Sequence, residues 1–410
     1  MRILFVHQNF PAQYKHLAPA LAAKSGNQVV ALTLKKPPSL PGVQVFPYRL
    51  SRGTSPNIHP WVSETETKVI RGEAAAKACL QLRRQGFVPD VICAHPGWGE
   101  SLFLKEVFPE AKLLAFIEFY YHTHQSDLDF DPEFLDQSFE TLCRARMKNA
   151  NNLLNLELCD WGVSPTHWQW QNIPTAYRDK VSIIHDGIDT QVVCPQPDQN
   201  LILAQAGLTL TSKDEVITFV NRNLEPYRGF HTFMRSLPEI LRRRPQAQVL
   251  ILGGDDISYG KPLPDGQSYK QKYLAEVGEK LDHSRVHFLG RVPYEEFLSI
   301  LRVSGVHVYL TYPFVLSWSM LEAMSTGCLV VGSATPPVKE IIEDGINGLL
   351  VDFFSPEQIA AAVDQVFDHS ERMLALRQRA RKTIIDRYDL KTICLPKQIE
   401  LVEILARVGG

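Results

Sequence analysis

Two arginines in the second half of the chain have a spacing that suits an anionic ligand. Arg222 and Arg228 belong to the segment NRNLEPYRG, in which Arg222 follows a predicted strand and Arg228 begins a predicted helix. A cation at a helix N-terminus opposes the helix dipole, and an anionic ligand would reverse the sign of that interaction. Because charge-assisted hydrogen bonds contribute about 1.5–3 kcal/mol each, the pair suits a diphosphate. The alternative is a surface salt bridge, for instance between Arg228 and Glu225.

Glu322 is the one acid in the segment TYPFVLSWSMLEAMSTGCLVV. This segment follows an apolar run, and its pattern indicates a loop, a short helix and a strand, as in parallel sheets. Ligands of such sheets lie outside the carboxyl ends of the strands, where the loop 313–319 would be. Glu322, expected in the first helical turn, could hold ribose hydroxyls there. Ser319 and Glu322 equally fit the S-x-x-E capping box of a helix start, and the local sequence leaves both interpretations open.

Two polar side chains at strand ends of the first half are candidates for contact with a substrate. His95 ends the strand VICAH, and Glu118 follows the strand that ends at Phe116. Each has a structural alternative, because a histidine at a strand end can be purely structural and a carboxylate can be buried and hydrogen-bonded.

Two further patterns imitate metal sites. His122 and His124 could place two imidazoles on one side of a strand, but no third ligand follows at a fixed spacing. The alternating acids of 127–131 resemble the start of a calcium loop, yet Pro132 and Ser138 stand where that loop needs a glycine and an acid. We therefore expect a solvated loop and no metal or other cofactor.

Composition bounds the class of protein. The chain has 410 residues, of which 45% are hydrophobic and 21% charged, and its formal net charge is −2. This length suggests two domains, and this charge argues against nucleic-acid binding through bulk charge. The seven cysteines are scattered without a C-x-x-C pattern, which indicates reduced thiols in a cytoplasm. MRILFV is typical of a first strand rather than a signal peptide, and no run approaches the roughly 18 apolar residues of a membrane span.

The elements that must position these side chains alternate between apolar strands and helices. This alternation predicts an α/β protein with two Rossmann-like doubly wound domains facing a cleft. We expect an N-terminal domain over 1–195, a second domain over 196–390, and a last helix over 391–410 that packs back on the first domain. Strands are predicted at 3–6, 28–34, 43–50, 91–95, 112–116, 160–164, 181–185, 216–220, 248–252, 286–289, 306–310, 328–331 and 349–351. Helices are predicted at 13–24, 61–85, 138–158, 230–243, 267–281, 294–302, 338–343, 371–387 and 396–407, with two more before Phe108 and after Pro356.

The second half resembles the nucleotide-sugar domain of the retaining glycosyltransferases of family four (group 1), which have the two-Rossmann GT-B architecture. The family's basic pair, written as G-R-x-x-x-x-K-G with small length variation, matches Arg222 and Arg228. Its L-E-A-M-x-x-G-x-x-V-V segment matches residues 321–331, which implies that Glu322 is the ribose-binding acid. Its E-x-x-x-D-G-x-x-G-x-x-V segment matches residues 340–351.

Two further motifs and one departure complete the resemblance. The glycine-rich strand end matches Gly254, and the v-x-f-x-G-x-v segment that borders the base in the family matches 286–292. The family usually has a second glutamate eight residues before Glu322, where this chain has Phe314, so contacts with the donor sugar must differ. In the first half the resemblance is weaker and rests on topology, on His95 and on a Gly-Ile-Asp triplet.

The resemblance implies a set of site residues. On the acceptor and catalytic side they are His95 and Glu118. The donor-binding residues are Arg222, Arg228, Gly254, Arg291, Val292, Phe314, Leu316, Ser317, Trp318, Ser319 and Glu322.

These observations predict a retaining, metal-independent glycosyltransferase that moves a hexose from a nucleoside diphosphate sugar (UDP- or GDP-sugar) to a saccharide or lipid-linked acceptor. The alternatives are a sugar-nucleotide epimerase of the same architecture and a catalytically silent nucleotide-sugar-binding or scaffold protein. We expect a cytoplasmic protein without a nucleic-acid partner. Basic segments at 242–244 and 377–382 could touch the inner face of a membrane.

Overall fold

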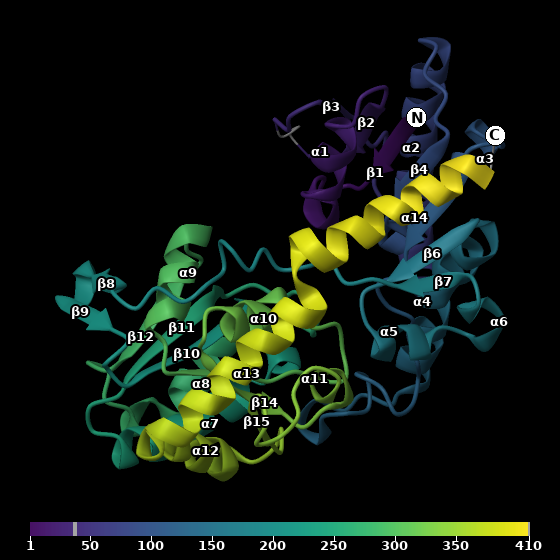
Figure 1. Cartoon of the computed structure of the whole chain (residues 1–410). Coiled ribbons are helices and arrows are strands. Elements are labelled where there is room, and N and C mark those ends of the chain that lie inside the picture. The colour runs from purple at the N-terminus through teal and green to yellow at the C-terminus, as the bar shows by residue number, and fades with distance from the viewer. Residues whose placement is uncertain (36–38, 409–410) are drawn as a thin grey trace. The chain divides into compact units, whose positions relative to one another are not determined.

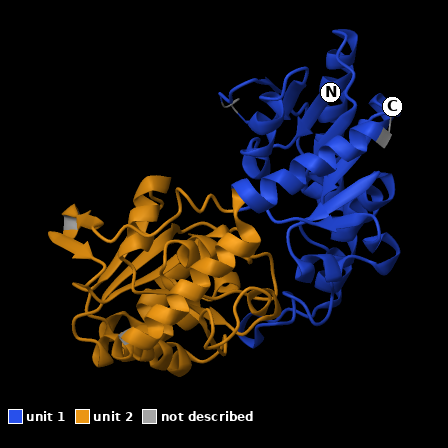
Figure 2. Ribbon diagram, viewed as in Figure 1, with its two compact units in different colours: residues 1–187, 391–410 blue, residues 188–390 orange. Residues whose placement is uncertain are grey.

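The computed structural model describes residues 1–35 and 39–408, and they form two compact units (Figure 1). Unit 1 contains Met1–Gly187 and the segment that starts at Lys391, and unit 2 contains Ile188–Leu390 (Figure 2). Each unit is described separately below.

The boundary between the units lies between Gly187 and Ile188, whereas the sequence analysis placed it after residue 195. The difference arises because Ile188 and Val193 are buried in the hydrophobic core of unit 2. Residues 188–195 therefore belong to unit 2.

Unit 1 is built on a parallel sheet with the strand order β3-β2-β1-β4-β5-β6-β7. Its strands are β1 (Arg2–Val6), β2 (Gln28–Thr33), β3 (Val43–Pro47), β4 (Val91–Ala94), β5 (Lys112–Phe116), β6 (Trp161–Ser164) and β7 (Val181–Ile183). Alternate residues of β1 enter two different cores, Leu4 and Val6 one, Ile3 and Phe5 the other. The sheet is thus covered on both faces, which explains the unbroken apolar runs of its strands.

Helices form the outer layers of unit 1. They are α1 (Leu17–Ala22), α2 (Ser63–Arg84), α3 (Leu104–Val107), α4 (Phe139–Leu158), α5 (His167–Asn172), α6 (Thr175–Arg178) and α14 (Leu395–Val408). The core on the Ile3 side is closed by α1 and by Val402 and Leu405 of α14. The helix predicted over 13–24 is shorter, because a start at residue 13 would place Pro19 beyond the first turn, where it breaks the helix.

Unit 2 repeats this plan with the strand order β12-β11-β10-β13-β14-β15. Its parallel strands are β10 (Val216–Asn223), β11 (Gln248–Gly254), β12 (Val286–Gly290), β13 (Val306–Tyr309), β14 (Leu329–Ser333) and β15 (Leu349–Val351). Its helices are α7 (Phe230–Arg243), α8 (Tyr269–Val277), α9 (Tyr294–Val303), α10 (Trp318–Ser325), α11 (Pro336–Lys339), α12 (Pro356–Asp368) and α13 (Ser370–Tyr388). Phe219 of β10 stacks on Phe233 of α7, with ring centroids 4.3 Å apart.

The sequence analysis missed one hairpin. β8 (Asn200–Leu203) and β9 (Leu208–Thr211) pair antiparallel at the start of unit 2. Leu201, Leu203 and Leu210 are buried, and the turn uses Gly207 at a φ of 63°. This alternation around a glycine was a usable signal.

In both sheets the strand order reverses beside the first strand, between β1 and β4 in unit 1 and between β10 and β13 in unit 2. This is the Rossmann-like doubly wound order, so the predicted fold class is confirmed. Ligands of such sheets bind outside the carboxyl ends of the strands at the point of reversal.

Two global features of the described residues are simple to state. None of their helices combines the length and the apolar character that a bilayer crossing requires. None of the seven cysteines, all within the described residues, forms a disulfide. Burial raises the pKa of the Cys79 and Cys93 thiols to about 12, which makes both unreactive.

Candidate active site

Arg228 is a buried cation beyond the carboxyl end of β10, and only 5% of its surface is exposed. Its Nη1 donates to Thr311 Oγ1 at 2.8 Å and to Tyr309 OH at 3.4 Å. The rings of Tyr259 and Phe314 lie 5.3 and 5.6 Å from its guanidinium carbon. The guanidinium is therefore held by neutral oxygen atoms and aromatic faces.

The expected alternative for Arg228, a salt bridge with Glu225, is wrong. Glu225 is fully buried, and its Oε2 accepts from the amides of Tyr259 at 3.1 Å and Gly260 at 2.9 Å, while its Oε1 accepts from Ser258 at 3.2 Å. Among the described residues Arg228 forms no ion pair. Burial alone would lower the pKa of the Arg228 guanidinium. The Glu225 charge attracts Arg228 without contacting it and helps to raise the pKa of the guanidinium, which can still bind an anionic ligand directly.

The Glu225 carboxylate therefore determines the position of the loop 258–260, and with it the Tyr259 ring that covers Arg228. Replacing Glu225 with glutamine would turn an NH2 group toward backbone donors. We expect Glu225→Gln to lower the free energy of unfolding by about 1–3 kcal/mol, since buried donors lose an acceptor. Urea denaturation measures this change. Glu239→Gln, which alters a partly exposed carboxylate on α7, is the control and should change stability far less; equal losses would contradict the role given to Glu225.

A close backbone contact places Arg228 and the start of α7 against β13. Gly229 has a φ of 68°, and a Cβ atom at this position would lie 2.3 Å from the Cβ of Leu310. Only glycine combines this conformation with this separation. The glycine of the basic motif therefore has a steric role.

The loop 313–319 is anchored to the same group of side chains. The amide of Ser317 donates to Tyr309 OH at 2.8 Å, so one phenol oxygen contacts both Arg228 and this loop. Phe314 is buried against Tyr227 and Tyr259, with ring centroids 5.5 and 4.9 Å apart. The residue that replaces the family's second glutamate is thus part of an aromatic cluster.

Glu322 lies on α10, and the capping box that the sequence left open as an alternative for it is wrong. The helix starts at Trp318, and its N-cap is Ser317, whose Oγ accepts from the amide of Ser319 at 3.3 Å. Glu322 is the fifth residue of the helix rather than part of its first turn, and only 6% of it is exposed. Its Oε1 accepts from the Tyr294 hydroxyl at 2.7 Å. The cap does not explain this buried carboxylate.

The remaining donor-side candidates of unit 2 are polar or glycine residues at strand ends and partly buried apolar residues. Arg291 donates through Nη2 to Asn223 Oδ1 at 2.8 Å and lies so close to Gly254 that a Cβ there would be 2.8 Å from its Nε. Arg222 is exposed at the end of β10. Partly buried residues that pack against the core are Val292, Leu316 and Trp318. Arg291 therefore lies beside the ends of β10 and β11.

In unit 1 the structure brings His95 and Glu118 together. His95 Nε2 lies 3.5 Å from Glu118 Oε2, and His95 Nδ1 accepts from the amide of Gly97 at 3.1 Å. Its ring is buried between Trp98 and Phe116, with centroids 4.6 and 5.4 Å away. The two candidates therefore lie next to each other at the carboxyl edge of the sheet.

His7 was missed by the sequence analysis. It follows β1 directly, and its ring centroid is 5.2 Å from that of His95. Burial, and then the neighbouring His95, lower the pKa of His7 to about 3, so this imidazole is neutral near pH 7. Its position in the sequence could have identified it, because His7 follows a strand directly, as His95 does.

Asparagines of α4 hold the loops that follow the two unit 1 candidates. Asn151 donates to the carbonyl of Pro96 at 2.8 Å, and Asn152 donates to that of Phe119 at 3.2 Å. Asparagine is a poor residue for a helix interior. Four asparagines within seven residues of α4 (149, 151, 152 and 155) were therefore a signal that the sequence offered.

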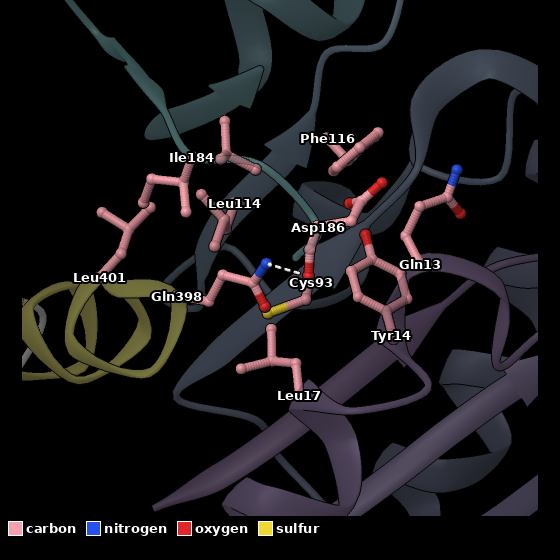
Figure 3. Close-up of a pocket in the computed structure, with 11 residues that line it drawn as sticks. Gln13, Tyr14, Leu17, Cys93, Leu114, Phe116, Ile184, Asp186, Gln398 and Leu401 are labelled. Atoms are coloured by element: carbon pink, nitrogen blue, oxygen red, sulfur yellow. Dashed lines mark hydrogen bonds between the residues drawn. The ribbon is translucent and has the colours of Figure 1, made fainter. Parts of the chain in front are cut away.

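A cavity of about 30 Å³ lies in unit 1 beneath this edge (Figure 3). Figure 3 shows the Tyr14 hydroxyl and the Gln398 amide on its wall, the latter donating to the Asp186 carbonyl at 3.5 Å. Such a volume holds water rather than a sugar.

The segments that imitated metal sites have other partners. His122 Nε2 lies 3.0 Å from the carbonyl of Asn172, and Asp129 accepts from the amides of Gln125 and Ser126, both at 2.8 Å. Across residues 1–35 and 39–408, no three histidine, cysteine or acidic side chains gather as a metal site.

The basic segments of unit 2 stabilise that unit itself. Arg242 and Arg243 bind Glu239, and Arg244 binds Asp364 at 2.5 Å. In the second segment, Arg377 donates to the carbonyl of Gly305 at 2.8 Å. Much of this positive charge is therefore occupied within the fold.

The fold and these two groups of residues define a two-domain protein of the GT-B glycosyltransferase class. Residues 25–193 match the family model described as glycosyl transferase family 4 group, and residues 204–383 match the one described as glycosyl transferases group 1. The chain belongs to the family-four, group 1 glycosyltransferases, as its motifs predicted.

Relatives and solved structures agree with this assignment. D-inositol 3-phosphate glycosyltransferases of Corynebacterium efficiens and Corynebacterium urealyticum are 26% and 27% identical over 205 and 209 residues, which cover 49% and 50% of this chain and 46% and 47% of theirs. The chain thus spans about half the length of these relatives. A sucrose-phosphate synthase from Thermosynechococcus elongatus has a TM-score of 0.75 at 18% identity, over 99% of this chain and 100% of that one. Anabaena HepE, solved with UDP and glucose, has a TM-score of 0.67 at 16% identity, with the same coverage of both chains. These structures show the fold alone.

Proposed function

We propose that the protein is a retaining, metal-independent glycosyltransferase that moves a hexose from a nucleoside diphosphate sugar to a saccharide or lipid-linked acceptor. One observation carries the donor side of this proposal: Arg228 is a buried cation that forms no ion pair among the described residues, at the point where the strand order of unit 2 reverses. A diphosphate supplies negatively charged oxygen atoms that bond to this guanidinium directly.

The residues then have distinct roles. Arg228 and Arg222, with the amides of the loop 313–319, stabilise the charge that develops on the departing diphosphate, so a metal is not needed for this step. Glu322 accepts hydrogen bonds from the ribose hydroxyls. His95 and Glu118 of unit 1 contact the transferred sugar and the acceptor.

The first test is calorimetric binding of UDP, GDP and ADP to the wild-type protein in excess EDTA. We expect one of the three to bind, with the same affinity as in buffer containing magnesium, because arginines rather than a cation hold the phosphates. UDP is the first choice, since it is the nucleotide bound by Anabaena HepE. Binding that disappears in EDTA would contradict the metal-independent site.

The second test follows transfer by NMR. A retaining enzyme forms a product whose new glycosidic bond has the same anomeric configuration as the donor. Nucleotide binding without transfer to any saccharide or lipid-linked acceptor would instead favour the silent binding protein. Interconversion of nucleotide sugars without an acceptor would favour the epimerase.

A further inference from the structure

Tyr294 is an exposed aromatic residue whose hydroxyl reaches a buried carboxylate. The residue begins α9, 47% of it is exposed, and its ring lies 5.9 Å from that of Phe297. The hydroxyl donates to Glu322 Oε1 at 2.7 Å, although the two residues are 28 positions apart and on different helices. Filling the core does not explain a side chain that is half in solvent.

The surroundings of Glu322 make this bond important. Met320, Leu321, Ala323 and Met324, its neighbours on α10, are all completely buried in the apolar core of unit 2. A carboxylate in such surroundings requires donors that fix its direction. Burial, and then the Glu322 carboxylate, raise the pKa of the Tyr294 phenol, so the phenol stays protonated and remains a donor.

We infer that Tyr294 is a positioning residue: its hydroxyl holds the Glu322 carboxylate in the orientation that accepts hydrogen bonds from the ribose of the nucleotide. The inference rests on the proposed function, because it takes Glu322 as the ribose-binding acid. It adds a residue outside the motifs that matched the family. Without the hydroxyl, the Glu322 carboxylate loses a donor that fixes its orientation, and restoring that orientation then reduces affinity only for ligands that carry ribose hydroxyls.

The test is a thermodynamic cycle between a protein hydroxyl and the ligand hydroxyls. Dissociation constants of UDP and 2′,3′-dideoxy-UDP are measured by calorimetry for the wild type, Tyr294→Phe and Tyr269→Phe. Tyr269 is the matched control, because its hydroxyl also donates within unit 2, to the carbonyl of Lys261 at 2.8 Å. We expect Tyr294→Phe to reduce the affinity for UDP by roughly tenfold, which is the usual effect of losing one charge-assisted hydrogen bond. Its affinity for the dideoxy ligand should match that of the wild type, and Tyr269→Phe should change neither value.

If Tyr294→Phe reduces the affinity for both ligands equally, or for neither, the positioning role is overturned while the proposed function stays intact. A wild type that binds UDP no better than 2′,3′-dideoxy-UDP would show that Glu322 does not hold the ribose, and the inference would fall with that part of the proposed function. A wild type that binds no nucleotide at all overturns both.

Discussion

Arg228→Ala should reduce the affinity of the protein for UDP by about 100-fold, which corresponds to roughly 2.7 kcal/mol. The guanidinium can form two charge-assisted bonds to a diphosphate, each contributing about 1.5–3 kcal/mol before the cost of binding is subtracted. Affinity for uridine, which has no phosphate, should remain unchanged. Calorimetric titration with both ligands measures this difference directly.

Two further variants separate ligand binding from folding. Arg228→Lys keeps the charge but loses the planar fork that contacts Thr311 and Tyr309, so we expect an affinity between those of the wild type and the alanine variant. Arg242→Ala removes an exposed arginine of α7 and should leave UDP binding as it is. If Arg228→Ala is folded and binds UDP like the wild type, Arg228 does not hold the diphosphate.

Glu322→Ala should reduce the affinity for UDP to a similar degree, about 100-fold, because two ribose hydroxyls lose a charged acceptor. For this variant the ligand whose affinity should stay unchanged is inorganic pyrophosphate, which contains no ribose, rather than uridine. Competition of pyrophosphate and of UDP against a fluorescent UDP analogue measures both values. Glu322→Gln, which keeps one acceptor oxygen, should fall between the wild type and the alanine variant.

Arg228→Ala and Glu322→Ala thus form a complementary pair. Arg228→Ala should lose the contacts with the phosphate end of the nucleotide, and Glu322→Ala should lose those with its ribose. Should Glu322→Ala weaken pyrophosphate as strongly as UDP, the substitution has disturbed the loop 313–319 rather than a ribose contact, and the assignment of Glu322 would be wrong.

The sequence predicted the elements of this site better than its contacts. Arg228 and Glu322 were found because both lie near the carboxyl ends of apolar strands, and strand ends are visible in a sequence as changes from apolar to polar residues. The parallel sheets themselves followed from the same alternation. The fold class was therefore accessible before any coordinates.

The contacts depend on residues that are distant in sequence, and local patterns could not decide between the alternatives for them. Ser317 and Ser319 can both cap a helix, and the S-x-x-E pattern left Ser319 open as the cap, whereas the helix is capped by Ser317. The spacing likewise left a salt bridge between Glu225 and Arg228 open as an alternative to an anionic ligand. The real partners of Glu225, the amides of 258–260, lie more than thirty residues away and carry no signal in their side chains.

Unit 1 is completed by a segment that is synthesised after the whole of unit 2. The core on the Ile3 face of its sheet is closed by α14, which follows the whole of unit 2 in the sequence. A ribosome therefore releases a continuous, complete unit 2 while the first 187 residues still lack a helix that covers part of their apolar surface. Unit 2, although second in order, can reach its native state first, and the nascent unit 1 depends until then on whatever shields exposed apolar side chains from aggregation.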